Sequence, residues 1–194
     1  MYEYIEGILK EKNPAFCVIE TTGIGYYIQI TLTTYTQLES HSHAKLYLHQ
    51  VIREDAHLLF GFFTRSEREM FRMLLTVSGI GANTARMMLS SLSADDIRQT
   101  ILTGNASLLQ GIKGIGAKTA QRIIIDLRDK VGRDKAPAGE IFPFQDNRLK
   151  EEALSALVIL GFNKGEADKV ISKILFAERN LTLEELIKKA LKQL

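Results

Sequence analysis

The 194-residue sequence contains no tryptophan, three prolines and one cysteine, Cys17. A single cysteine excludes an internal disulfide framework and a zinc site built from cysteines, and it suits a reducing compartment. No uninterrupted apolar run approaches the roughly 20 residues that span a bilayer, and the first residues show no basic segment followed by an apolar one. These absences predict a soluble cytoplasmic protein without a membrane span.

Charge is distributed unevenly along the chain, although the net charge is only +2. Residues 1–64 hold 4 Lys and Arg against 7 Asp and Glu, residues 65–135 hold 12 against 7, and residues 136–194 hold 9 of each. A basic middle region favours an anionic partner such as nucleic acid. Charges scattered over solvated faces explain the same numbers equally well, so this pattern needs the support of a motif.

The first third of the chain has the pattern of short β-strands. Residues 45–49 alternate polar and apolar side chains, as a half-buried strand does. Other runs are rich in β-branched and aromatic residues, and Thr22-Gly23 separates two of them as a turn. These runs are 15–20, 25–30 and 57–62. About five short strands in some 60 residues predict a small barrel or a sandwich.

From Thr64 onward the apolar residues recur at helical spacing. Thr64 and Glu67 have the spacing of a capping box, in which both side chains bind free amides at a helix start. Ser93 and the two acids that follow it indicate another helix start, because acids favour the positive end of the helix dipole. Residues 65–132 are therefore predicted to be helical.

Residues 133–147 lack apolar periodicity and hold two of the three prolines, which indicates a linker. Three short amphipathic helices follow, and we expect Asn163 and Thr182 to cap the second and third. Their predicted core residues are Leu154, Leu157, Val158, Val170, Ile174, Leu186 and Leu191. We place the domain boundaries at 1–64 for the strands, 65–139 for the central helices, 140–147 for a flexible linker and 148–194 for the final helices.

The most informative feature is an internal repeat. Residues 78–85, Ser-Gly-Ile-Gly-Ala-Asn-Thr-Ala, recur 35 positions later at 113–120 as Lys-Gly-Ile-Gly-Ala-Lys-Thr-Ala. The apolar flank keeps the same offset, since Leu74 corresponds to Leu109. One Gly-Ile-Gly is common, but two copies at one offset between helical segments are much harder to obtain by chance.

Each copy predicts a helix, a glycine hairpin and a second helix. Glycine permits a positive φ and lets a ligand approach the backbone closely. The first amides of the second helix have no partner within the helix, so together with the helix dipole they form a site for anions such as phosphates. Such a site holds a nucleic-acid backbone without reading the bases. A pair of tight turns with glycine caps is the purely structural alternative.

The candidate DNA-binding residues are the glycines of both hairpins and the hydroxyl, amide and basic side chains that follow them. They are Gly79, Gly81, Asn83, Thr84, Arg86, Gly114, Gly116, Lys118, Thr119 and Arg122. Two copies of the hairpin beside a basic surplus favour nucleic-acid binding over two structural turns.

Motifs for catalysis, cofactors and metals are not apparent. Residues 111–119 almost spell a phosphate-binding loop, but Ala117 separates the last glycine from Lys118, so we expect no ATPase site. The four histidines, at positions 41, 43, 49 and 57, all lie in the region of the predicted strands. His41-Ser42-His43 falls in a probable loop without a usual zinc spacing, and we interpret this pair as solvated loop histidines. We therefore expect no catalytic residue, no metal and no cofactor. The acidic pair Glu54-Asp55 falls in a hairpin turn between two strands, where an ordinary polar turn is the simplest interpretation.

The whole chain resembles the RuvA family of Holliday junction branch-migration subunits. The strongest matches lie in residues 53–62, Arg-Glu-Asp-Ala-x-Leu-Leu-x-Gly-Phe, and in the two glycine hairpins. Residues 5–9 and 23–26 also match. The resemblance implies an α+β multidomain fold with an OB-like β barrel, a central helical domain with two helix-hairpin-helix motifs and a C-terminal three-helix bundle.

The resemblance also implies roles for these parts. It makes the chain a non-catalytic DNA-binding subunit that opens four-way junctions into a square during recombination and repair. The barrel would form a homotetramer, Glu54 and Asp55 would be an acidic pin at its centre, and the hairpins would hold the minor-groove backbones of a duplex arm. Residues 148–194 would recruit the hexameric RuvB ATPase, and a RuvC-type resolvase would join a larger complex.

One departure weakens the first hairpin, because Ala82 and Asn83 stand where the family often has Pro and Lys. Two other classes of protein also fit part of the pattern. Nucleases and glycosylases carry tandem helix-hairpin-helix motifs, but they need a catalytic Lys, an Asp or a metal cluster that we do not find. A pure adaptor is the other alternative, since Leu160-Gly161-Phe162 resembles the loop of ubiquitin-associated-type bundles.

Overall fold

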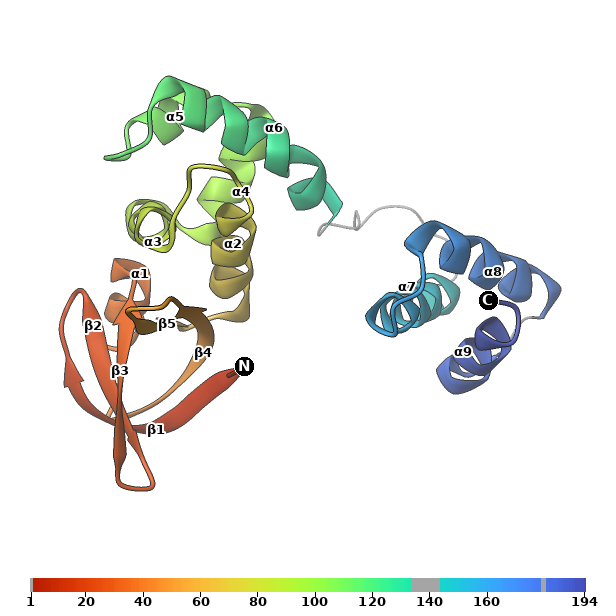
Figure 1. Cartoon of the computed structure of the whole chain (residues 1–194), viewed down its shortest axis with the longest axis horizontal. Coiled ribbons are helices and arrows are strands. Elements are labelled where there is room, and N and C mark those ends of the chain that lie inside the picture. Colours follow the sequence, from red (N-terminus) through yellow and green to blue (C-terminus); the bar gives the residue numbers. More distant parts are fainter. Residues whose placement is uncertain (1, 134–143, 179–180) are drawn as a thin grey trace. The chain divides into compact units, whose positions relative to one another are not determined.

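The computed structural model describes residues 2–133, 144–178 and 181–194 (Figure 1). The chain forms two compact units, Met1–Ala136 and Pro137–Leu194, which we call the N-terminal and the C-terminal unit. None of the helices in these described ranges is long and apolar enough to cross a membrane.

Five strands of the N-terminal unit close into a barrel, in the order β1-β2-β3-β5-β4. All neighbouring pairs are antiparallel except β3 and β5. A short helix, α1 (Leu32–Gln37), lies between β3 and β4. The strands are β1 (Tyr4–Lys12), β2 (Phe16–Thr21), β3 (Ile24–Ile30), β4 (His43–Ile52) and β5 (His57–Phe62). The prediction of a small barrel is confirmed, and the sandwich alternative is wrong.

The barrel closes around alternating apolar side chains. In β1, for example, Ile5 points inward while its neighbours Tyr4 and Glu6 are exposed. Cys17 belongs to this interior, and burial raises the pKa of its thiol to about 12, so the thiol is inert at neutral pH. The barrel interior is formed by Ile5, Cys17, Ile19, Ile28, Ile30, Leu38, Ala44, Leu46 and Leu48.

Five helices follow the barrel within the same unit. Their bounds are α2 (Arg65–Leu75), α3 (Ala82–Ser91), α4 (Ala94–Thr103), α5 (Ala106–Gln110) and α6 (Ala117–Arg133). Phe60 and Phe62 of β5 pack with Met70 and Phe71 of α2, so the last barrel strand and the helices share one hydrophobic cluster. This shared core attaches the helices firmly to the barrel.

The helix starts follow the predicted capping with one correction. Ser93 and Asp96 form the full capping box of α4, and the Thr64 side chain accepts a hydrogen bond from the Glu67 amide at the start of α2. The Glu67 carboxylate, however, does not return to Thr64. It is buried and accepts hydrogen bonds from the hydroxyls of Thr31 and Thr34 beside the barrel. The capping-box prediction for Thr64 is therefore only half right.

We expect Glu67 to make the stability of the chain depend on pH. Burial raises the pKa of this carboxyl above its usual 4.5, despite the hydrogen bonds from Thr31 and Thr34. The folded state then holds the proton more tightly than the unfolded state. This contribution to the free energy of unfolding is fully present below pH 4.5 and is lost as the pH rises through the raised pKa.

Urea unfolding of the native chain and of the Glu67→Gln variant, measured across this pH range, tests the predicted direction of the change in stability with pH. The free energy of unfolding of the native chain, taken relative to that of the variant, should fall as the pH rises. A difference that stays constant with pH would show that Glu67 titrates alike in the folded and unfolded states.

The C-terminal unit is a bundle of α7 (Phe144–Ile159), α8 (Lys164–Ala177) and α9 (Leu183–Leu191). Asn163 caps α8, and Thr182 forms a capping box at α9, as predicted. Helix α7 begins within the segment expected to be a linker, and positions 140–143 of that segment lie outside the described residues. Two predicted core residues are wrong, since Val158 and Leu191 are each 41% exposed. The buried core is Ala153, Leu157, Ala167, Ile171, Ile174, Leu186 and Ala190.

Candidate nucleic-acid interface

The two repeat copies have matching backbone geometry. We call residues 76–81, between α2 and α3, the first hairpin, and residues 111–116, between α5 and α6, the second hairpin. The Ile80 amide donates to the Val77 carbonyl at 3.0 Å, and 35 positions later the Ile115 amide donates to the Ile112 carbonyl at the same distance. The side chains of these four residues are buried in the shared core, so each hairpin is anchored to the core by two apolar residues.

The two glycines of each hairpin differ in backbone conformation. Gly79 and Gly114 both have φ = +91°, a region that side chains rarely adopt. Gly81 and Gly116 lack a positive φ, and a Cβ placed on either of them meets nothing within 4 Å. Neither a positive φ nor a close neighbour therefore requires glycine at 81 and 116, and both positions leave the backbone open to a ligand.

The helix that follows each hairpin begins at an open surface. Gly81 precedes α3 as its N-cap, with φ −92° and ψ 171°, and supplies no capping side chain. The amides of Ala82, Asn83 and Thr84 therefore lack the side-chain acceptor that Ser93 gives to α4. The repeat places Gly116 at the same point before α6, where the Ala120 amide donates to the Gly116 carbonyl. Both sites offer amides and a positive helix end to an anion.

The predicted DNA-binding residues gather on the two hairpins, and their side chains differ in accessibility. Asn83 and Lys118 are exposed at equivalent positions, while Thr84 and Thr119 are half-buried. Lys113, which was not among the predicted residues, is exposed next to Gly114 and corresponds to Ser78 in the first hairpin. Its position directly before Gly114, the glycine with positive φ, was the sequence feature that could have identified it as a cation of the second hairpin.

The two predicted arginines contact protein atoms. Arg86 donates through Nη1 to the Ala15 carbonyl at 3.0 Å. Arg122 donates through Nη1 to the Ser78 carbonyl of the first hairpin at 3.4 Å, which links the two motifs. The second hairpin presents more exposed positive charge than the first, because it carries Lys113 and Lys118 where the first has Ser78 and Asn83.

Glu54 and Asp55 form the tip of the β4–β5 hairpin. Arg53 and Ala56 close this turn, since the Arg53 amide donates to the Ala56 carbonyl at 2.8 Å. Both acids are exposed, and across the described ranges neither makes an ion pair or a side-chain hydrogen bond. We call these two residues the acidic turn. It presents two carboxylates that the rest of its own unit does not neutralise.

Other candidate sites do not gain support from the geometry. Within the described ranges, no group of three His, Cys, Asp or Glu side chains is placed to hold a metal ion. His41 and His43 are exposed, and His49 lies in β4 against the Phe71 ring. Burial, with Arg72 and Arg68 nearby, lowers the pKa of His49.

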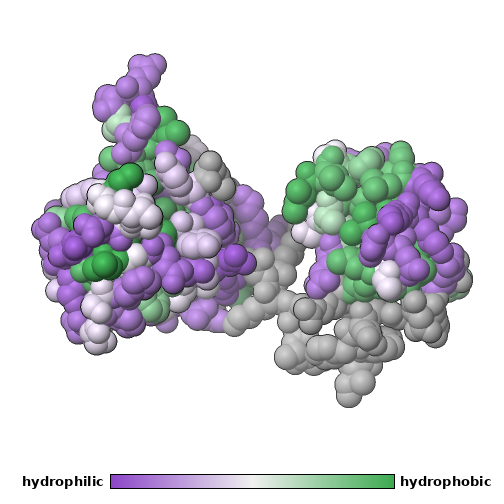
Figure 2. All heavy atoms as spheres, turned by 90° about the horizontal axis from the view of Figure 1, so that it is seen from below, coloured by the Kyte–Doolittle hydropathy of each residue, from purple (hydrophilic) through white to green (hydrophobic). Residues whose placement is uncertain are grey.

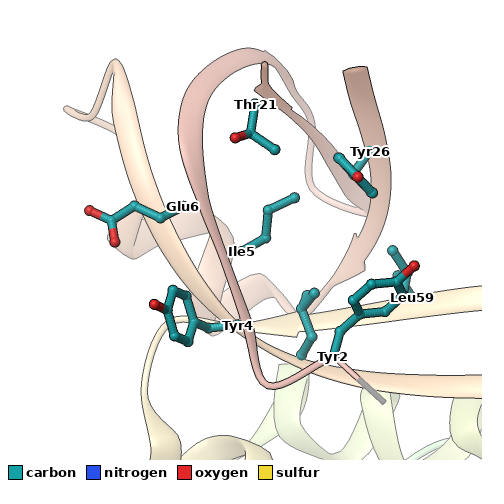
Figure 3. A pocket seen from close by; sticks show the side chains of 8 residues that line it. Tyr2, Tyr4, Ile5, Glu6, Thr21, Tyr26 and Leu59 are labelled. Carbon is teal, nitrogen blue, oxygen red and sulfur yellow. The ribbon is translucent and has the colours of Figure 1, made fainter. Parts of the chain in front are cut away.

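A cavity of about 360 Å³ opens on the barrel and is lined by side chains from all five strands (Figure 3). Tyrosines and apolar residues dominate its lining, and no basic side chain contributes. The lining residues are Tyr2, Tyr4, Ile5, Glu6, Thr21, Tyr26, Leu48 and Leu59. The lining residues therefore offer no cation to a phosphate.

Comparisons with known proteins cover the whole chain. Residues 1–61 match the RuvA N terminal domain, residues 71–129 the SAM-like helix-hairpin-helix tandem, and residues 149–194 the RuvA C-terminal domain. The chain is 49% identical to a protein of Christiangramia forsetii and 46% identical to one of Flavobacterium psychrophilum, with all of each chain covered. A protein of Bacteroides fragilis is 44% identical over the full length of both chains. All three are named Holliday junction branch migration complex subunit RuvA. The chain therefore belongs to the RuvA family.

Proposed function

We propose that this chain is a DNA-binding subunit that recognises four-way (Holliday) junctions, holds them in an open square and recruits a RuvB-type ATPase motor for branch migration. The observation that carries the proposal is the duplicated hairpin, with open amides at the start of two helices and glycines that the fold itself does not require. The names of the full-length relatives support the same function. Recombination and DNA repair in the cytoplasm are the processes that such a subunit serves.

The hairpins hold phosphates of one duplex arm across its minor groove. Amides at the starts of α3 and α6 donate to phosphate oxygens, Thr84 and Thr119 add hydroxyl donors, and Lys118 adds a cation. None of these groups reads a base edge, so selectivity for a junction comes from the shape of the DNA and the symmetry of the protein.

The acidic turn supplies the second part of the selectivity. A homotetramer with four-fold symmetry brings the Glu54 and Asp55 carboxylates of every subunit close to the point where the four strands cross. Phosphates forced into that space meet like charge, which disfavours a stacked junction and favours an open one. The exposed, unpaired carboxylates of the turn support this role.

The C-terminal unit, within residues 148–194, is the module that contacts the motor. Its large exposed apolar side chains include Ile159 at 82%, Leu160 at 60% and Phe176 at 93% exposure. Figure 2 shows an apolar area on this unit. Exposed apolar patches of this kind favour a protein partner. The C-terminal unit therefore acts as a protein-binding adaptor within the proposed function. A RuvC-type resolvase also joins the assembly, and we assign no residues of this chain to its binding.

A binding assay with magnesium separates the proposed function from its rivals. A labelled four-way junction and a duplex of the same arm sequence are titrated with the chain. We expect tighter binding of the junction, with no cleavage of either DNA. A nuclease would cleave, and a pure adaptor would bind neither DNA.

Lys118 should contribute more than its counterpart Asn83. We expect Lys118→Ala to weaken junction binding and to make the plot of log affinity against log salt shallower by up to about 0.9 per lost phosphate contact in each subunit. Fluorescence titrations at several salt concentrations give this slope. Asn83→Ala is the matched control and should leave the slope unchanged. An unchanged slope for Lys118→Ala in an intact tetramer would contradict its role.

The C-terminal unit should be separable from DNA binding. We expect a chain that ends after Gly139 to bind junctions with near-native affinity, because the hairpins and the acidic turn lie in the N-terminal unit. It should no longer bind the motor in a pull-down. Ile159→Asp in the full chain should give the same separation without a truncation. If the shortened chain still supported ATP-driven branch migration, the motor module would be wrongly assigned.

A further inference from the structure

Arg86 of helix α3 reaches away from the first hairpin toward the barrel. The side chain is half-buried, and its Nη1 donates to the Ala15 carbonyl at 3.0 Å. The same carbonyl accepts the Ile30 amide of β3 at 3.1 Å. The guanidinium is therefore attached to the turn between β1 and β2, at a carbonyl that the barrel already holds in place.

That turn has little freedom to move. The Asn13 side chain accepts the Ala15 amide at 2.8 Å and the Phe16 amide at 3.0 Å, and the Asn13 amide donates to the Phe16 carbonyl at 2.9 Å. An asparagine that closes a turn through its own side chain is a rigid local structure. Arg86 therefore contacts a fixed point of the barrel and not a mobile loop.

Further contacts attach the same helix to the barrel side. The Ser90 hydroxyl, one helical turn after Arg86, accepts the Leu32 amide at 3.1 Å, and the Leu89 carbonyl accepts the Thr33 hydroxyl at 2.9 Å. Figure 1 shows α3 beside α1. Among these three contacts, the one from Arg86 lies nearest to the first hairpin, which ends at Gly81.

The repeat gives an independent reason to separate Arg86 from phosphate binding. The residue 35 positions after Arg86 is Gln121, so the second hairpin has no cation at the equivalent place. If this position contacted the DNA backbone, the more basic hairpin would be expected to carry a cation there too. Arg86 is instead the position at which the first motif meets the barrel.

We propose that Arg86 is a positioning residue, which fixes the first hairpin relative to the barrel that carries the acidic turn and so contributes to junction selectivity. The proposal rests on the proposed function. A plain duplex needs only the hairpins, whereas a four-way junction needs the hairpins and the acidic turns in register. Loss of this contact should therefore affect the junction more than the duplex.

The test compares Arg86→Gln with Lys118→Gln. For Arg86→Gln we expect the ratio of duplex Kd to junction Kd to fall about three- to tenfold, while the salt slope for the duplex stays unchanged. For Lys118→Gln the slope should fall by up to about 0.9 per lost contact. Arg128→Gln, which removes one exposed positive charge from α6, controls for net charge. A lower slope for Arg86→Gln would make it a phosphate ligand and would overturn the proposal.

Asn13→Ala provides a second variant that changes no charge. By loosening the turn that presents the Ala15 carbonyl, it should also lower the junction preference. Its effect and that of Arg86→Gln should be non-additive in the double variant, because both act on one contact. Fully additive effects would contradict the proposal.

Hydrogen exchange in the absence of DNA distinguishes failure of this inference from failure of the proposed function. In both Arg86→Gln and Asn13→Ala, the hydrogen-bonded amides of Ile80 and Ala85 should exchange faster than in the native chain. The matching amides of Ile115 and Ala120 should not. Equal exchange in all three proteins would overturn the positioning role. A native chain without junction preference would overturn the proposed function, whatever the exchange shows.

Discussion

The double variant Gly81→Val/Gly116→Val should lose at least about 100-fold of its affinity for four-way junctions. Each valine side chain would occupy the open space beside Gly81 or Gly116, through which we propose that a phosphate reaches the amides at the start of α3 or α6. Hydrogen bonds to a charged group are worth about 1.5–3 kcal/mol each, and 1.4 kcal/mol corresponds to a tenfold change in affinity. In the proposed assembly, both hairpins of every subunit would lose such bonds. Fluorescence titration of a labelled junction measures the effect.

The fold should tolerate these substitutions. Gly81 has an extended backbone that valine also adopts, and a Cβ at either position meets no neighbour within 4 Å. We therefore expect the free energy of unfolding to change by no more than about 1 kcal/mol. Ser91→Val, at the far end of α3, is the control and should bind normally. A stable double variant with native affinity would show that the hairpins do not approach the DNA backbone.

Neutralising the acidic turn should change selectivity in a particular direction. In the proposed tetramer, Glu54→Gln/Asp55→Asn would remove the repulsion between carboxylates and phosphates at its centre. Binding should strengthen, most of all for plain duplexes and other forms that the native charge discourages. The preference for the four-way junction should fall as the overall affinity rises, and the rate of motor-driven strand exchange should change with it. Parallel titrations with junction and duplex measure both effects.

An ordinary polar turn predicts a different result, since exposed turn charges are worth only fractions of a kcal/mol. Glu11→Gln/Glu39→Gln is a matched control, because it removes the same charge from exposed positions of the same barrel segment. This control should leave the junction preference unchanged. If the Glu54 and Asp55 double variant stayed tetrameric and kept both its duplex affinity and its junction preference, the two acids would form an ordinary polar turn without a role in DNA selectivity.

The sequence predicted those parts of the fold that depend on local patterns. The repeat placed both hairpins, because a glycine with positive φ followed by a helix start leaves a recognisable local signature. The caps at Ser93 and Thr182 were predictable for the same reason, since cap and partner lie three residues apart.

The errors concern side chains whose partners are distant in the sequence. Glu67 has the spacing of a capping box, yet its carboxylate turns to Thr31 and Thr34, more than 30 residues earlier. The contact of Arg86 with the Ala15 carbonyl could not be predicted for the same reason, because no pattern within α3 shows that Ala15 lies within reach. Helical spacing likewise assigned Val158 to the core, while the packing of three short helices leaves it 41% exposed. Such contacts are determined by tertiary packing.

We propose that this chain holds a four-way junction open. Energy transfer between dyes on adjacent arms of a junction, measured in magnesium with and without the chain, tests it most directly. In magnesium the free junction stacks its arms in pairs, which gives unequal distances between adjacent arms. We predict that the bound chain makes these distances equal, as a square requires. A junction that is bound but keeps its unequal, stacked distances would show that the chain does not open it.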